Sequence, residues 1–271
     1  AGATMAFNEW YGASGDFYDH FLAQSARFDK NGGSANYLQR QLSLSNRKTW
    51  TQSFWMKLGV TGAHQQIFQS ADNNSSTGNY AGYAIDGNGN FSIFNYSNSY
   101  QIRLVASTAF RDLSAWYHFV VRWDTTQGTN TNRIRVYANG VQITFNTHTT
   151  FPSQNFDSQI GNNTAHHIAS GNINRNNALN GYFSEYIMLD GQSLGPDSFG
   201  ETKNDIWVPI DTSGLTYGNA SFKLNFANSS AMGNDVSGRN TDWTASNFGA
   251  HDQVPDSPTN NFATLNPIAP D

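Results

Sequence analysis

The stretch RIRVYANGVQITF, residues 133–145, decides the fold class of this chain. Apolar residues occupy every second position on both sides of a central Asn-Gly pair, at Ile134, Val136, Ala138, Val141, Ile143 and Phe145. Strict alternation is typical of a β-strand with one buried face. Asn139 and Gly140 both tolerate a positive φ, which a tight hairpin turn requires. The stretch therefore predicts a β-hairpin whose turn serves the backbone rather than any chemistry.

Composition extends this prediction to the whole chain and excludes several functions. Of the 271 residues, 13% are charged and 14% are aromatic, with 24 glycines and no cysteine. Aromatic and β-branched runs separated by Gly and Asn indicate an all-β protein. A net charge of −5 with scattered cations argues against a nucleic-acid partner. No apolar run reaches the roughly 20 residues of a membrane span, and without cysteine there is no thiolate chemistry.

The hairpin is one of about a dozen short strand-like segments. In TWTQSFWMKL, residues 49–58, and in YHFVVRWD, residues 117–124, apolar residues again alternate. Such spacing predicts a two-sheet antiparallel sandwich, a jelly roll. We expect an N-terminal arm at 1–24, the jelly roll at 25–198, and a small β extension packed on it at 199–250. Residues 251–271, which hold several prolines, are expected to form an extended tail or linker.

Four fragments in order carry a resemblance to a known superfamily. They are TWTQSFWMKL, AWYHFVVRWDTTQGTNTNRIRVYANGVQIT, QIGN and LNGYFSEYIMLDGQSL. Their pattern resembles the concanavalin A-like lectin/glucanase superfamily in its laminin-G and pentraxin-like branch. The positions that match its pattern are Trp116, His118, Tyr137, Asn139, Gly140, Ile160 and Gly161. The resemblance implies a jelly roll of two curved sheets.

A second resemblance concerns the C-terminal part. MLDGQSLGPDSFGE and the segment from Asn204 to Phe248 are similar to uncharacterised tail-fibre or structural proteins of tailed bacteriophages. This implies a non-enzymatic virion component (tail fibre, spike or decoration) on the outer surface of the particle. Its partners would be other virion proteins, copies of itself as a homo-oligomer, or a host cell-surface glycan. Alternatives are a purely structural assembly protein without glycan binding, a secreted carbohydrate-binding adhesin and, more remotely, a glycoside hydrolase.

Catalytic patterns are weak in this sequence. Glucan-cleaving relatives carry paired acids at alternate strand positions, which places both carboxylates in one cleft. Glu185 and Asp190 are five residues apart, so in a regular strand they face opposite sides. His118 is expected to be a satisfied core or interface histidine, and His166-His167 lack helical zinc spacing. We therefore expect no enzymatic activity.

Calcium is the one cofactor that we consider, because laminin-G and pentraxin relatives often bind it in loops. Calcium prefers six to eight oxygen ligands. The candidate ligands lie in two Asn-rich loops, at Asp72 and Asn74 and at Asp86, Asn88 and Asn90. A third loop, GNDVSGRNTD, offers Asp235, Asn240 and Asp242. The same residue types also build ordinary β-turns.

Exposed aromatic residues near polar loops are candidates for sugar contact, because a pyranose stacks on an aromatic face. The candidates for carbohydrate binding are Tyr80, Tyr83, Tyr96, Tyr100 and Trp123. Aromatic residues in the terminal arms are candidates for assembly contacts, namely Phe7, Trp10, Phe17 and Phe262.

Overall fold

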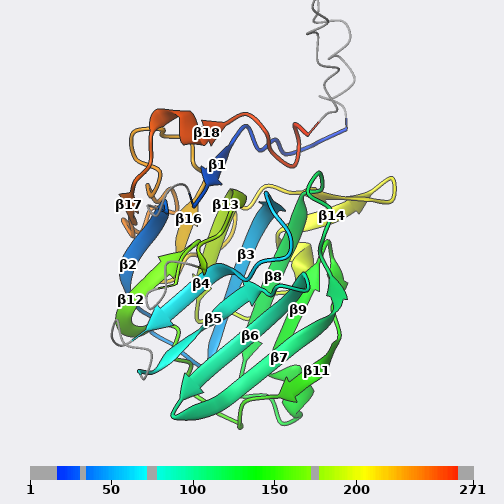
Figure 1. Cartoon of the computed structure of the whole chain (residues 1–271), viewed down its shortest axis with the longest axis vertical. Coiled ribbons are helices and arrows are strands. Elements are labelled where there is room, and N and C mark those ends of the chain that lie inside the picture. Colours follow the sequence, from blue (N-terminus) through cyan, green and yellow to red (C-terminus); the bar gives the residue numbers. More distant parts are fainter. Residues whose placement is uncertain (1–16, 31–34, 72–77, 172–176, 262–271) are drawn as a thin grey trace, which may run out of the picture.

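The computed structural model describes residues 17–30, 35–71, 78–171 and 177–261. Two eight-stranded antiparallel sheets face each other, and the all-β sandwich predicted from the sequence is confirmed (Figure 1). Sheet A has the order β10 (Val141–Gln142), β9 (Ile134–Ala138), β8 (Tyr117–Asp124), β3 (Thr49–Leu58), β13 (Gly181–Asp190), β1 (Ser25–Phe28) and β18 (Gln253–Val254), with β16 (Phe222–Leu224) also pairing with β13.

Sheet B faces the viewer in Figure 1. Its order is β11 (Phe145–Thr150), β7 (Ser99–Ala109), β6 (Asn90–Ser97), β5 (Tyr80–Ile85), β4 (Gln65–Ala71), β12 (Asn162–Ile168), β2 (Tyr37–Ser43) and β17 (Thr244–Ser246). A separate hairpin pairs β14 (Gly200–Lys203) with β15 (Ile206–Pro209). Short 3₁₀ turns occur at Asn130–Asn132, Pro196–Ser198 and Ala250–Asp252.

The predicted hairpin is formed by β9 and β10. Asn139 and Gly140 have φ values of 47° and 79°, as a tight turn with two left-handed residues requires. The second arm is shorter than the alternation predicts, because the chain leaves sheet A after Gln142 and enters sheet B at Phe145. Val141 at the turn is therefore exposed, and the expectation that it faces the core is wrong. Ile143, on the crossing segment, is buried.

Aromatic rings from both sheets fill the space between the layers. The Phe54 ring of β3 is parallel to the Tyr83 ring of β5, with 5.9 Å between centroids. The hydroxyls of Tyr83 and Tyr186 are 3.1 Å apart, and the Tyr186 hydroxyl donates to Gln52 Oε1. Because these buried hydroxyls are hydrogen-bonded, tyrosine can replace phenylalanine here without a large desolvation cost.

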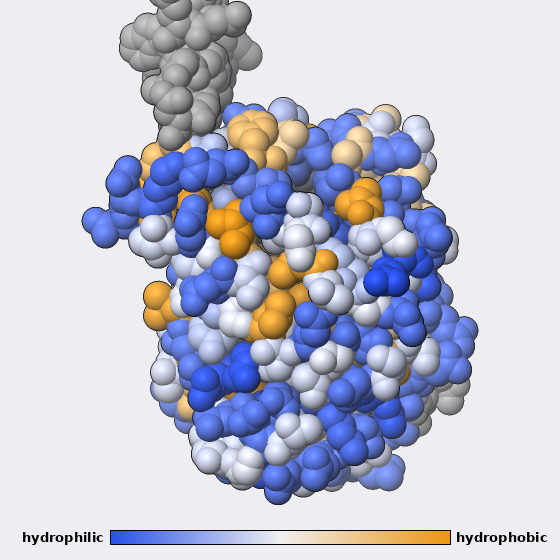
Figure 2. Space-filling view, turned by 180° about the vertical axis from the view of Figure 1, so that it is seen from behind, coloured by the Kyte–Doolittle hydropathy of each residue, from blue (hydrophilic) through white to orange (hydrophobic). Residues whose placement is uncertain are grey.

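Sheet A is buried on both faces. The outward side chains of its central strands, among them Val120, Ile187 and Leu189, form a second apolar cluster with Phe199 and Tyr217. A third cluster joins Leu22, Trp55 and Trp116, with the partly buried Tyr182 and Trp207 packed against it. A layer of chain outside the sandwich therefore covers this sheet. Figure 2 shows the side opposite to that of Figure 1, where the surface is mostly hydrophilic with hydrophobic residues in scattered patches.

The C-terminal extension expected at 199–250 contributes to both sheets. Its strand β16 pairs with β13 in sheet A, and β17 pairs with β2 in sheet B. Phe222, Leu224 and Trp243 belong to the same apolar cluster as the sandwich interior. The extension and the jelly roll thus share one core.

The two terminal segments, residues 17–24 and 250–261, form what we call the terminal strap. Thr259 Oγ1 accepts a hydrogen bond from the Leu22 amide and donates one to the Leu22 carbonyl. Asp256 accepts from the Trp116 indole and from Lys57 Nζ. Residues 251–261 were expected to be a tail or linker, and this is wrong for them, because these hydrogen bonds fix them to the body of the protein.

Two buried histidines hold backbone and side chains in place. His166 Nε2 accepts a hydrogen bond from the Gly161 amide, and its Nδ1–H donates to the Thr164 carbonyl. His118 Nδ1 accepts from the Trp207 indole, so its Nε2–H donates to Ser53 Oγ at 2.8 Å. Both rings are neutral in these arrangements. The prediction that His118 is a satisfied core histidine is confirmed.

Replacing Gly140 by alanine should destabilise the protein. An added Cβ would lie 2.5 Å from a ring carbon of Trp207, and the positive φ disfavours any L side chain. We expect Gly140→Ala to lower the free energy of unfolding by roughly 2 kcal/mol or more. Gly128→Ala is the matched control, because nothing lies within 4 Å of a Cβ there. Equal urea midpoints for the two variants would contradict the conclusion that the turn and the Trp207 contact require glycine at position 140.

Acid should destabilise the protein through the buried histidines. Burial lowers the pKa of His118 and His166 to about 3. Below pH 6.5 the unfolded chain binds a proton at each histidine while the folded protein does not, so stability falls as pH decreases towards 3. At pH 5 the loss relative to pH 7 is roughly 2 kcal/mol for each histidine.

Urea unfolding at pH 7 and pH 5 measures this effect. His118→Gln and His166→Gln should each reduce the difference in unfolding free energy between the two pH values. His64→Gln, at a partly exposed position in the loop before β4, is the control and should leave that difference unchanged. A pH dependence that is the same in all three variants would refute the role of the buried rings.

Candidate functional site

Three of the five candidate aromatic residues lie together on the outer face of sheet B. Tyr80 on β5 is directly opposite Tyr96 on β6, which is opposite Tyr100 on β7. The rings of Tyr80 and Tyr96 are stacked with centroids 5.0 Å apart, and Tyr100 meets Tyr96 edge-on at 5.3 Å. We call this group, with Phe94 and Arg103 beside it, the tyrosine surface.

The tyrosine surface is open because buried and exposed residues alternate along β6 and β7. Tyr100 is 44% exposed, and the Arg103 guanidinium lies 5.0 Å from its ring centroid. Burial and, to a smaller extent, a hydrogen bond with the Tyr100 hydroxyl together raise the pKa of Tyr80 to about 12. The surface therefore offers aromatic faces, neutral phenol hydroxyls and one fixed cation.

The other two candidate aromatic residues are buried. Tyr83 belongs to the sandwich core, and Trp123 stacks on Trp50 with centroids 4.8 Å apart. The expectation that Tyr83 and Trp123 are exposed is wrong. In β5, Tyr83 is three residues from Tyr80, and an odd spacing in a strand places two side chains on opposite faces.

The proposed calcium loop between β5 and β6 does not fit a metal site. Asp86 Oδ1 accepts hydrogen bonds from the amides of Asn88 and Asn90, as in an ordinary turn. The Asn88 carbonyl accepts two hydrogen bonds from the Arg111 guanidinium, and Asn90 donates its side-chain amide to Ala106. The Arg111 guanidinium therefore already pairs with the carbonyl oxygen of Asn88, one of the candidate calcium ligands. Asp72 and Asn74 lie outside the described residues.

The third candidate loop has its acidic groups engaged in its own folding. Burial raises the pKa of Asp235, but hydrogen bonds from the amides of Lys223, Thr241 and Ser237 outweigh burial and hold it below its usual range. Asp242 Oδ1 accepts from the Asp235 amide. Across the ranges that the structure describes, no three His, Cys, Asp or Glu side chains gather as a metal site.

A cleft of about 900 Å³ opens at a discontinuity in sheet A. Strand β1 pairs with the first part of β13 and β16 with the second, so residues 184 and 185 lie between them without a ladder partner on that edge. On the other edge a β-bulge inserts Glu185 between Ser184, opposite Trp55, and Tyr186, opposite Phe54. The cleft is formed where β1 and β16 separate.

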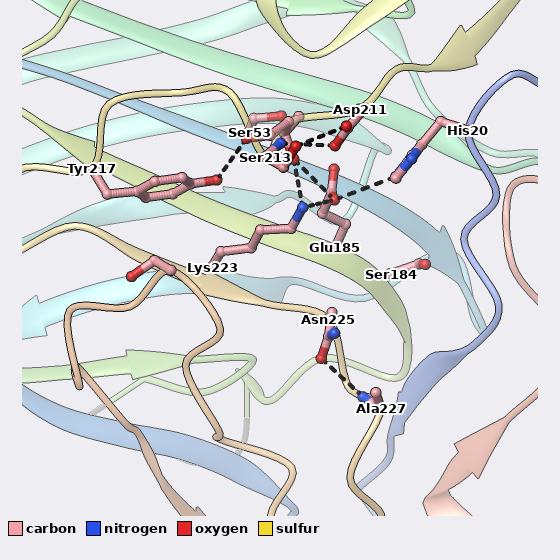
Figure 3. Close-up of polar contacts among 12 residues, drawn as sticks. His20, Ser53, Ser184, Glu185, Asp211, Ser213, Tyr217, Lys223, Asn225 and Ala227 are labelled. Carbon is pink, nitrogen blue, oxygen red and sulfur yellow. Dashed lines mark hydrogen bonds and ion pairs between the residues drawn. The ribbon is translucent and has the colours of Figure 1, made fainter.

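Glu185 forms the floor of this cleft (Figure 3). Its side chain is only 4% exposed, and its φ is 47°, an unfavourable value for a residue with a Cβ. Glu185 Oε2 lies 2.8 Å from Lys223 Nζ, and the Thr212 hydroxyl donates to the same oxygen at 3.2 Å. Lys223 Nζ also donates to Thr212 Oγ1, and His20 Nε2 is 4.0 Å from Glu185 Oε2.

Sequence reasoning considered Glu185 only as a catalytic acid and did not identify the other members of the cleft. Lys223, Thr212 and His20 come from segments far from Glu185 in the sequence, and no local motif links them. The bulge that turns Glu185 into the cleft is also invisible in the sequence. A single acid inside the otherwise uncharged run GYFSEYIML was the available signal.

The groups considered for catalysis have separate structural partners. Asp190 accepts hydrogen bonds from the amides of Ser45 and Asn46, whereas Glu185 pairs with Lys223. Ser53 and His118 form a buried serine–histidine pair, but an indole N–H rather than a carboxylate faces His118 Nδ1. A neutral, buried imidazole without an orienting carboxylate is a poor general base.

The residues expected to mediate assembly are mostly outside the described ranges, as Phe7, Trp10 and Phe262 are. Phe17 begins the described part of the terminal strap, where its ring lies 5.8 Å from Lys203 Nζ. No helix among the described residues has the length and hydrophobicity needed to cross a bilayer.

The fold and the open aromatic surface define a lectin-like β-sandwich. The profile of Laminin_G_3, described as the concanavalin A-like lectin/glucanases superfamily, matches residues 31–190. Because the match covers more than half of the chain, the protein belongs to this superfamily. No curated protein sequence matches the chain.

Several solved structures are similar at low identity. The native heptameric SAP-like pentraxin from Limulus polyphemus is 16% identical, with 65% of this chain and 79% of that chain covered and a TM-score of 0.45. The CBM40 of a Ruminococcus gnavus IT-sialidase, bound to α2,3 sialyllactose, is 11% identical over 60% and 89%, with a TM-score of 0.41. Mouse laminin α1 domains LG4-5 are 12% identical over 77% and 48%, with a TM-score of 0.42.

Proposed function

We propose that this protein is a non-enzymatic glycan-binding component that contacts sugars through the tyrosine surface. The observation that carries the proposal is the row formed by Tyr80, Tyr96 and Tyr100 across three neighbouring strands on the open face of sheet B. Rings fixed by strand pairing lose little conformational entropy on binding. The membership of residues 31–190 in a lectin-like superfamily supports the same function.

The chemistry of the tyrosine surface suits a pyranose. The exposed ring of Tyr100 offers a face or edge to the apolar side of a sugar, and phenol hydroxyls both donate and accept hydrogen bonds. Arg103 adds a donor that also favours an acidic substituent on the glycan. Single contacts of this kind are weak, so useful avidity requires several copies.

The proposed setting is the surface of a bacteriophage particle, as part of a tail fibre, spike or decoration. Support comes from the resemblance of the segment that begins at Met188 to uncharacterised tail-fibre and structural proteins of tailed phages. A repeated, outward-facing protein of this kind presents many weak sites at once. Its partners would be copies of the same chain and other virion proteins.

Mutation of the tyrosine surface should weaken glycan binding. We expect Tyr96→Ala to lose binding on an array of bacterial surface glycans by about tenfold or more, equivalent to ~1.4 kcal/mol. Leu113→Ala is the matched control, because Leu113 lies outside the tyrosine surface and is 40% exposed. This fraction is close to the 44% of Tyr100, whose variant Tyr100→Ala is tested alongside Tyr96→Ala. Binding that survives Tyr96→Ala and Tyr100→Ala would exclude this surface as the site.

A purely structural role predicts a different result. In that case no glycan binds, and the protein still assembles. Deletion of residues 1–16, which precede the described strap, should abolish assembly in light scattering while the urea midpoint of the sandwich stays unchanged. Unchanged assembly would show that the N-terminal arm does not mediate it.

Antibodies raised against the chain should label purified phage particles, and unlabelled particles would refute the virion setting.

A further inference from the structure

The cleft beside Glu185 is built mainly by chain that lies outside the matched superfamily region. Of its lining residues, only Ser184 and Glu185 fall within residues 31–190. The walls come from residues 20–24 of the terminal strap and from the extension, at 213–217, 223–227 and 236–239. The extension therefore adds a concave site to sheet A, on the side away from the tyrosine surface.

The sheet does not need Glu185. Along β3, Phe54 and Trp55 are consecutive, and their partners on β13 are Tyr186 and Ser184. Glu185 is therefore one extra residue in a ladder that would be continuous without it. It has an unfavourable φ of 47° and is almost fully buried, although a buried carboxylate is costly. A residue that costs stability and that pairing does not require is a candidate for function.

One oxygen of Glu185 is available to a ligand. The ion pair with Lys223 and the hydrogen bond from Thr212 both involve Oε2. Oε1 accepts no hydrogen bond from any residue in the described ranges, and it is not sealed from the cleft. Lys223 Nζ has three donors and two partners within these ranges, so one donor remains. The floor thus presents one free acceptor beside one free donor.

The charges of the floor select a neutral ligand. The Glu185 carboxylate and the Lys223 ammonium cancel each other at 2.8 Å. A ligand cation would meet Lys223, and a ligand anion would meet the free oxygen of Glu185, so each would encounter a like charge. A molecule with two adjacent hydroxyls meets both needs, since one hydroxyl donates and its neighbour accepts.

We propose that this cleft binds a neutral sugar, with one hydroxyl donating to Glu185 Oε1 and the adjacent hydroxyl accepting from Lys223 Nζ. The rim supplies the apolar contact. Phe21 is 54% exposed and Val236 is also exposed, and both line the cleft. An exposed phenylalanine at the mouth of a polar site is suited to stacking on the apolar face of a pyranose. The site does not depend on the tyrosine surface.

Calorimetric titration of the full chain with glucose, galactose, mannose and their neutral disaccharides tests the proposal. Glu185→Gln should weaken binding by roughly tenfold or more, as expected when a hydrogen bond to a charged group is lost. Phe21→Ala, at an exposed position that should not affect folding, should weaken it several-fold. Leu113→Ala, at an exposed position outside both the cleft and the tyrosine surface, is the control and should leave this binding unchanged.

Each alternative result is decisive. If no neutral sugar binds, or if binding is the same in wild type and in Phe21→Ala, the cleft is not the site, whether or not Glu185→Gln folds. If Tyr96→Ala abolishes binding and Glu185→Gln does not, the cleft proposal fails while the function proposed for the tyrosine surface stands. Loss in Phe21→Ala with binding retained in Tyr96→Ala supports the cleft alone.

Discussion

Sheet A is apolar on both of its faces, and this constraint shapes the rest of the molecule. Its inner face fills the sandwich, and its outer face carries Val120, Ile187 and Leu189. Each such side chain contributes about 1.5–3 kcal/mol when fully buried. Exposing the three would cost several kcal/mol, a large share of the ~5–15 kcal/mol by which a domain is stable. The chain beyond β13 must therefore return across this sheet.

The same requirement explains where the molecule keeps open surface. The extension and the terminal strap cover sheet A, and they leave one face of β6 and β7 in sheet B open, together with Tyr80 at the start of β5. Tyrosines on that face are fixed in a row by strand register. The extension also joins sheet A through β16, and the cleft lies where β16 and β1, which pair with the same edge of β13, do not meet.

Alternation along the sequence was sufficient to predict the sandwich and the Asn139-Gly140 turn, because both depend on neighbours in the chain. The same alternation shows that Tyr80 and Tyr83 point to opposite faces of the strand, because they are three residues apart. The two residues could therefore not both have been exposed. The meeting of Tyr80, Tyr96 and Tyr100 could not be predicted, because it depends on which strands pair and in which register. The position of Glu185 in the cleft was harder still to predict, because a β-bulge interrupts the two-residue alternation from which the direction of a side chain is inferred.

The terminal strap has a mechanical consequence. The described chain enters at Phe17 and leaves at Asn261 on the same side of the molecule, where Tyr18 contacts Pro258 and Leu22 contacts Thr259 (Figure 1). A force that pulls these two ends apart loads the hydrogen bonds between the two segments of the strap one after another. The strap would peel back toward β1 and β18 and uncover Trp55 and Trp116 while the sandwich stayed closed. Under tension, this protein would lengthen at its strap before it unfolded.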